Sequence, residues 1–129
     1  MGILGATAVA IGAYGAHGLK SYLESGLMTP DLLNGFDTGV KYQMYHTLAM
    51  FLVLLLNKEN NNKLLHFSFN LFLGGIILFS GSLYFLTTRY VLGIEGLKFL
   101  GPITPIGGLL FIAGWLLLVI AAVKSKSNS

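Results

Sequence analysis

Long uncharged apolar segments alternate with short polar segments along the whole chain, and this pattern predicts a protein that crosses a membrane several times. The longest such segment has no charged residue between Phe67 and Thr88. Its length is typical of a membrane-spanning helix, because a helix satisfies its own backbone hydrogen bonds in hydrocarbon. Three other segments are similarly apolar. The predicted spans cover residues 2–18, 41–56, 64–88 and 103–123.

The segment between the first two predicted spans contains the start of a further helix. Thr29-Pro30 has the residue types preferred at the N-cap and first position, and Asp31 follows in the first turn, where a carboxylate is favoured. The next turns carry an apolar stripe formed by Leu32, Leu33, Phe36 and Val40. Such a stripe predicts an amphipathic helix in the membrane interface that leads into the second span. The predicted fold class is all-α, with four transmembrane helices and this interfacial helix in a single domain over residues 1–129.

Glycines occur at helical spacing within several of the predicted spans. Small residues at such positions allow a second helix backbone to come close, which is how many membrane helices pack. We therefore predict helix-packing positions at Gly12, Gly81, Gly107 and Gly114. The alternative is that apolar helices rich in glycine and alanine produce this spacing by chance.

Composition supports the membrane prediction and limits the partners. Hydrophobic residues make up 54% of the 129 residues and charged residues only 10%, so much apolar surface must face lipid or other protein. The net charge of +3 is spread over the polar segments, which suits anionic lipid headgroups better than nucleic acid. The absence of cysteine excludes disulfides, thiolate metal sites and cysteine nucleophiles. We expect membrane lipids as partners and no nucleic acid.

Four spans would place both termini and the central polar segment on one side of the membrane. Lysine and arginine are equally numerous on the two sides. Those on the side of the termini stand in shorter segments next to the spans, where the positive-inside bias is strongest. We therefore predict that both termini are cytoplasmic. The first span has no basic residue before it, so we expect a retained helix rather than a cleaved signal peptide.

Two histidines and two tyrosines are the main candidates for a binding site. His17 closes the first span, and Tyr42, Tyr45 and His46 share one helix face at the start of the second span, beside Gln43. Ionisable groups in a membrane indicate function, so we consider a pocket for a polar ligand or quinone, and a metal or haem site. The competing interpretation is that these side chains are anchors at the lipid–water boundary. Because two imidazoles without a carboxylate or thiolate rarely hold a metal, we expect no metal and no cofactor.

A catalytic set is not evident in the sequence. Ser80 and Ser82 lie within the third span, but a serine nucleophile needs a base and no histidine is expected at that depth. We expect these hydroxyls to bond a carbonyl of their own helix or to bridge to a neighbouring helix. We therefore predict no catalytic residue and no enzymatic activity.

Several motifs in order resemble one family of small membrane proteins, domain of unknown function 423, whose animal relative is called transmembrane protein 256. The motifs are GAYGAHGLK (Gly12–Lys20), KYQMYHTLA (Lys41–Ala49), LFSGSLY (Leu78–Tyr84), LGPITPIGG (Leu100–Gly108) and FIAGW (Phe111–Trp115). The resemblance spans the whole chain and implies four helices in the bacterial inner membrane, with no established molecular activity. Members usually begin further upstream, which indicates a start codon before Met1.

Three functional hypotheses are compatible with these observations. The first is a non-enzymatic subunit or scaffold that packs in a homo-oligomer or a larger membrane complex, as the glycine positions favour. The second is a small transporter or pore, which would need oligomerisation because four helices leave little room for a polar path. The third is a membrane enzyme that binds lipid or quinone through His17, Tyr45 and His46.

Overall fold

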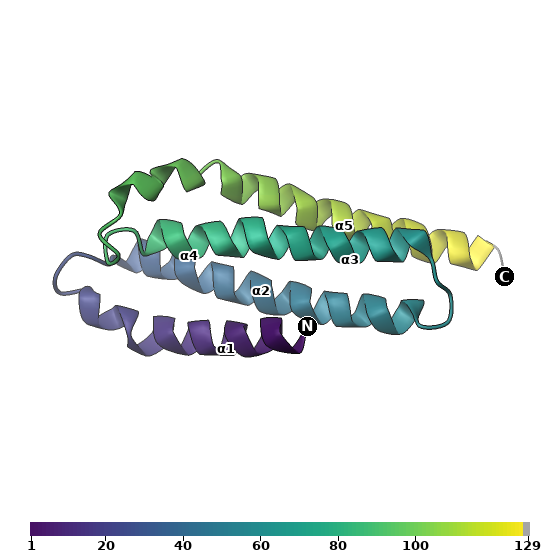
Figure 1. Cartoon of the computed structure of the whole chain (residues 1–129), viewed down its shortest axis with the longest axis horizontal. Helices are drawn as coiled ribbons and strands as arrows, with labels where there is room; N and C mark the ends of the chain where they lie inside the picture. Colours follow the sequence, from purple (N-terminus) through teal and green to yellow (C-terminus); the bar gives the residue numbers. More distant parts are fainter. Residues whose placement is uncertain (128–129) are drawn as a thin grey trace.

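The structure is a computed structural model that describes residues 1–127, and all its regular elements are helices. Four long helical segments lie side by side (Figure 1). These segments are α1 (Gly2–His17), α2 (Pro30–Asn57), a third segment made of α3 (Lys63–Gly75), η2 (Ile76–Ser80) and α4 (Gly81–Thr87), and α5 (Ile103–Ser127). Two short 3-10 helices, η1 (Leu19–Tyr22) and η3 (Glu95–Leu100), follow α1 and precede α5.

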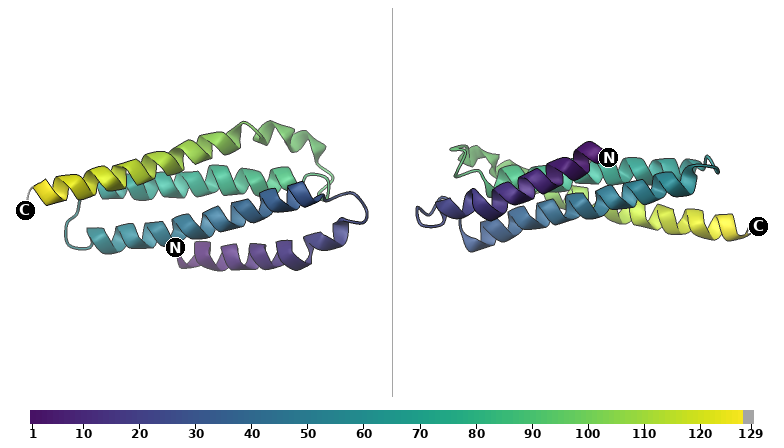
Figure 2. Two further views of the ribbon diagram at one scale, coloured as in Figure 1. Left: turned by 180° about the vertical axis from the view of Figure 1, so that it is seen from behind. Right: turned by 90° about the horizontal axis from the view of Figure 1, so that it is seen from below.

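Neighbouring segments run in opposite directions, in the order α1, α2, third segment and α5 across the molecule (Figure 1). The most extensive packing is between α3 and α5, and α1 packs on α2. Met1 lies beside the middle of α2 rather than at its end (Figure 1). Figure 2 shows the C-terminal end of α5 extending beyond the ends of α2 and α3. The arrangement leaves α2 in contact with helices on both of its sides.

The predicted helix start at Thr29-Pro30 is confirmed, but the interfacial position predicted for the helix that follows is not. The Thr29 side chain accepts a hydrogen bond from the Leu32 amide at 3.1 Å, and α2 then continues without a break to Asn57. The stripe containing Phe36 packs against η1 and α4, in a buried cluster with Leu19 and Met28. The amphipathic interfacial helix is therefore not confirmed, because its apolar face is covered by protein.

Three helical segments among the described residues are long and apolar enough to cross a membrane: Gly2–Tyr22, Lys63–Thr87 and Glu95–Lys126. These correspond to the first, third and fourth predicted spans. The second predicted span lies within α2, whose mean hydropathy is lowered by polar residues such as Lys41, Gln43 and His46. The all-helical fold with membrane-spanning helices is thus confirmed, whereas the second of the four predicted spans is not.

The third segment contains a wide helical turn, the π-helix η2. One extra residue in a helical turn rotates everything after it by about 100° relative to an uninterrupted α-helix. Before the turn, Ser68 donates a hydrogen bond to the Gly114 carbonyl in α5 at 2.8 Å. At its end, Ser80 donates to the Gly39 carbonyl in α2 at 2.7 Å. The third segment thus presents one hydroxyl group to α5 before the wide turn and one to α2 at its end.

The glycines predicted to lie at helix contacts differ in how closely another segment approaches them. A Cβ added to Gly107 would overlap the backbone nitrogen of Phe79, and one added to Gly114 would lie 2.7 Å from the Phe72 ring. A Cβ on Gly12 would meet Val40 at 3.1 Å. At Gly81, in contrast, a Cβ would meet nothing within 4 Å. The expectation of a close approach at Gly81 within this chain is therefore not met.

Candidate functional site

A cleft lined by aromatic side chains lies between α2 and α5, and we call it the aromatic cleft. Its volume is about 670 Å³. Its lining comprises Tyr42, Tyr45, His46, Pro105, Gly108, Leu109, Phe111, Ile112 and Trp115. At this cleft α2 and α5 are in contact through their side chains. On the inner side of the cleft, η2 and α3 pack against α5. Three of the five predicted site residues therefore meet at one place.

His46 is buried at the inner wall of the aromatic cleft, and both of its ring nitrogens are occupied. Trp115 Nε1 donates a hydrogen bond to His46 Nε2 at 3.1 Å, so Nε2 is the acceptor. The other nitrogen, Nδ1, then carries the proton and donates to the Tyr42 carbonyl at 2.8 Å. The ring also stacks on Phe111 with a centroid separation of 3.6 Å. His46 thus has no free lone pair for a metal or haem iron in this arrangement.

The two tyrosines lie at the mouth of the cleft. Tyr42 stacks on Phe79 at a centroid distance of 4.8 Å, and its side chain is 39% exposed. Tyr45 is 54% exposed and Trp115, on the opposite wall, is 43% exposed. Neither tyrosine hydroxyl has a hydrogen-bond partner within residues 1–127. The cleft therefore offers flat apolar walls with two phenol hydroxyls near its opening.

Gln43 faces away from the aromatic cleft and joins three helices. Its Nε2 donates to the Leu4 carbonyl at 2.8 Å and to Thr7 Oγ1 at 2.9 Å, both in α1. Its Oε1 accepts a hydrogen bond from the Tyr84 hydroxyl of α4 at 2.6 Å. We call these contacts the Gln43 network. Because its amide oxygen and nitrogen are both used within the protein, Gln43 ties α1, α2 and α4 together.

His17 does not join the other candidates. It is exposed at the end of α1, and within the described chain it contacts neither Tyr42, Tyr45 nor His46. The antiparallel packing explains this: Gly15 lies against Phe36 and Gly12 against Val40, so α1 ends toward the start of α2. His17 therefore does not share a site with His46, as a single binding site for these candidates would require, because His46 lies further along α2 and packs on α5.

Sequence reasoning missed the partners that make the aromatic cleft a site. Phe111 and Trp115 supply the wall of the cleft that faces His46, and they are four residues apart in α5. This spacing places both rings on one helix face, which was the available signal. The sequence does not show that this face of α5 lies opposite α2.

The serine hydroxyls bond as expected for a membrane helix. Ser80 bridges to α2, while Ser82 donates to the Phe79 carbonyl at 3.0 Å and contacts Thr104 Oγ1 at 2.5 Å. Within the described residues no group of three or more metal-binding side chains comes together. The polar atoms in the interior therefore connect helices, and the aromatic cleft is suited to bind an apolar partner.

Comparison with known proteins places this arrangement in one family. The family model described as "Protein of unknown function (DUF423)" matches residues 11–108. The chain is 44% identical to the "UPF0382 membrane protein" of Haemophilus influenzae over 92% of its own length and 86% of that protein. It is 42% identical to the UPF0382 membrane protein YwdK of Bacillus subtilis, covering 91% and 87% of the two chains. No solved structure matches the protein.

Proposed function

Since the chain belongs to the DUF423 family of membrane proteins, we propose that it is a non-enzymatic subunit that packs in a homo-oligomer of the bacterial cytoplasmic membrane. The aromatic cleft carries this proposal. Its occupant is a transmembrane helix of a second copy.

Two features of the cleft support a helix as its occupant. Gly108 lies on its floor, where a small residue lets a helix backbone come close. Tyr45 and Trp115 stand partly exposed on its two walls, and tyrosine and tryptophan are the side chains that most often dominate the energy of protein interfaces. The two ring nitrogens of His46 at its inner wall, by contrast, are both used within the chain. The site is therefore equipped for packing rather than for proton transfer.

Filling the aromatic cleft should dissociate the oligomer. A Cβ at Gly108 would meet the Phe79 ring only at 3.8 Å, so a side chain is accommodated at its base. We expect Gly108→Trp to shift the mass measured in native mass spectrometry to that of the monomer, with the helical content unchanged. Ile77→Trp introduces the same indole ring on an exposed face of η2 outside the cleft and should leave the oligomer intact.

Other results of this experiment would contradict the subunit proposal. A wild-type protein that is monomeric in nanodiscs has no helix of a second copy in its cleft. In that case a small hydrophobic ligand is the remaining candidate, because the two tyrosine hydroxyls are available at the opening. Trp115 is the only tryptophan of the chain, so quenching of its fluorescence by a quinone would identify that alternative.

We also propose that α2 crosses the membrane as the second of four spans, with both termini in the cytoplasm. The chain has no cysteine, so single cysteines can be introduced and labelled from either side. Cysteines at Ser25 and Gly96 should react from the periplasmic side and one at Asn61 from the cytoplasmic side. Labelling of Ser25 and Asn61 from the same side would mean that α2 does not cross.

A further inference from the structure

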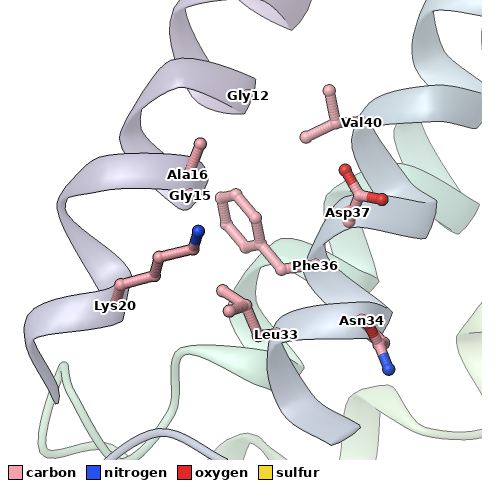
Figure 3. A pocket seen from close by; sticks show the side chains of 9 residues that line it. All are labelled: Gly12, Gly15, Ala16, Lys20, Leu33, Asn34, Phe36, Asp37 and Val40. Carbon is pink, nitrogen blue, oxygen red and sulfur yellow. The ribbon is translucent and has the colours of Figure 1, made fainter. Parts of the chain in front are cut away.

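A second hollow lies on the other side of α2, between this helix and α1 (Figure 3). We call it the α1–α2 groove, and its volume is about 250 Å³. Gly12, Gly15 and Ala16 form its α1 wall, which lacks large side chains. The buried ring of Phe36 closes it from the α2 side. The groove is separate from the aromatic cleft, with which it shares no residue.

Two opposite charges face each other across this groove without touching. Figure 3 shows the Lys20 amine of η1 turned toward the Phe36 ring and the Asp37 carboxylate on the other side of that ring. Within the described residues, Lys20 makes no ion pair. Asp37 pairs through Oδ2 with Lys41 at 2.8 Å, which leaves its second oxygen available. The groove can therefore accept an anionic group beside Lys20 and a cationic group beside Asp37 at the same time.

The groove lies where the polar end of the bundle gives way to its apolar part. Asp37 and Lys41 are the last charged residues of α2 before Lys58, and the exposed side chains that follow are apolar, including Leu48 and Phe51. Likewise, α1 is apolar along its length, and Lys20 follows it in η1. Lysine side chains at such a boundary extend toward lipid headgroups. A charged molecule in the groove would thus lie at headgroup depth.

We propose that the α1–α2 groove binds the headgroup of a phospholipid that carries a primary amine, the chemistry of phosphatidylethanolamine. The phosphate lies beside Lys20, and the ammonium group donates hydrogen bonds to the free oxygen of Asp37. A choline headgroup has the same net charge but no N–H to donate, so Asp37 discriminates against it. A purely anionic headgroup would bring its charge close to the Asp37 carboxylate, which disfavours it.

Lipid competition tests this assignment. The purified protein is reconstituted in nanodiscs with equal parts of phosphatidylethanolamine, phosphatidylcholine and phosphatidylglycerol of matched acyl chains, then released, and the retained lipid is identified by native mass spectrometry. We expect phosphatidylethanolamine to be enriched about three- to tenfold over the other two lipids. Asp37→Asn should abolish the preference over phosphatidylcholine, and Lys20→Gln should reduce retention of all three.

Matched variants distinguish lipid binding in the groove from a general effect of surface charge. Asp31→Asn and Lys98→Gln remove exposed charges of the same signs, at positions that do not line the groove, and should leave the lipid preference unchanged. Circular dichroism should show the same helical content in all four variants, because each replaced side chain is exposed. Equal retention of the three lipids by the wild type, or preferential retention of phosphatidylglycerol, would overturn the proposal. So would an Asp37→Asn variant that still prefers phosphatidylethanolamine.

Discussion

Replacing Gly107 by alanine should lower the free energy of unfolding by about 3 kcal/mol. The added Cβ would overlap the backbone nitrogen of Phe79 in η2, and a backbone atom cannot move aside by rotation as the tip of a side chain can. The third segment and α5 would have to separate along their contact to relieve the overlap. Reversible unfolding in mixed micelles, followed by circular dichroism, measures the change.

Gly81→Ala is the matched control for this prediction. A Cβ there would meet nothing within 4 Å, and alanine is a better helix former than glycine by about 0.5–1 kcal/mol. We therefore expect opposite signs for the two substitutions, destabilising at Gly107 and neutral to stabilising at Gly81. Equal effects would show that these glycines reflect composition and not helix contact.

Replacing Gln43 by leucine should destabilise the protein by about 2 kcal/mol. The substitution removes the three hydrogen bonds of the Gln43 network and leaves the hydroxyl of Tyr84 without its partner. Interhelix hydrogen bonds in membranes contribute about 0.6 kcal/mol each on average, and an unpaired buried hydroxyl adds to the loss. The same unfolding assay reports the effect.

A double-mutant cycle shows whether the effect comes from the network. Tyr84→Phe removes one hydrogen bond and should cost about 0.6 kcal/mol alone. In the Gln43→Leu background it should cost less, because the hydroxyl has already lost its acceptor. Additive effects of the two substitutions would mean that Gln43 stabilises the protein only through packing.

The helices of this protein could be predicted because their signals are local. The uncharged segment predicted as a span over residues 64–88 is helical as far as Thr87, and Thr29-Pro30 starts α2 as predicted. The packing of the stripe around Phe36 against protein could not be predicted in the same way. An apolar face looks the same in sequence whether lipid or a neighbouring helix covers it.

The candidate site depends on the register between neighbouring helices and on the helix face on which each side chain lies. Neither can be read directly from the sequence. Gly74 and Gly81 are seven residues apart and would share a face in an uninterrupted α-helix. A Cβ on Gly74 would meet Leu110 of α5 at 3.3 Å, but the wide turn of η2 rotates Gly81 out of that contact. Similarly, the pairing of Gly12 with Val40 sets the register of α1 and separates His17 from His46. Neither the wide turn of η2 nor the register of α1 against α2 can be recognised from the residue types in the sequence.

The wide turn in the third segment should affect its evolutionary constraints, because the main neighbour of the segment changes there. Before residue 76 the segment packs mainly on α5 and after residue 80 mainly on α2, so we expect compensating substitutions mainly in α5 for the first part and mainly in α2 for the second. A single-residue deletion between residues 76 and 80 would restore ordinary helix and turn Tyr84 away from Gln43. We therefore expect the residues of this one segment to covary mainly with α5 before the turn and mainly with α2 after it.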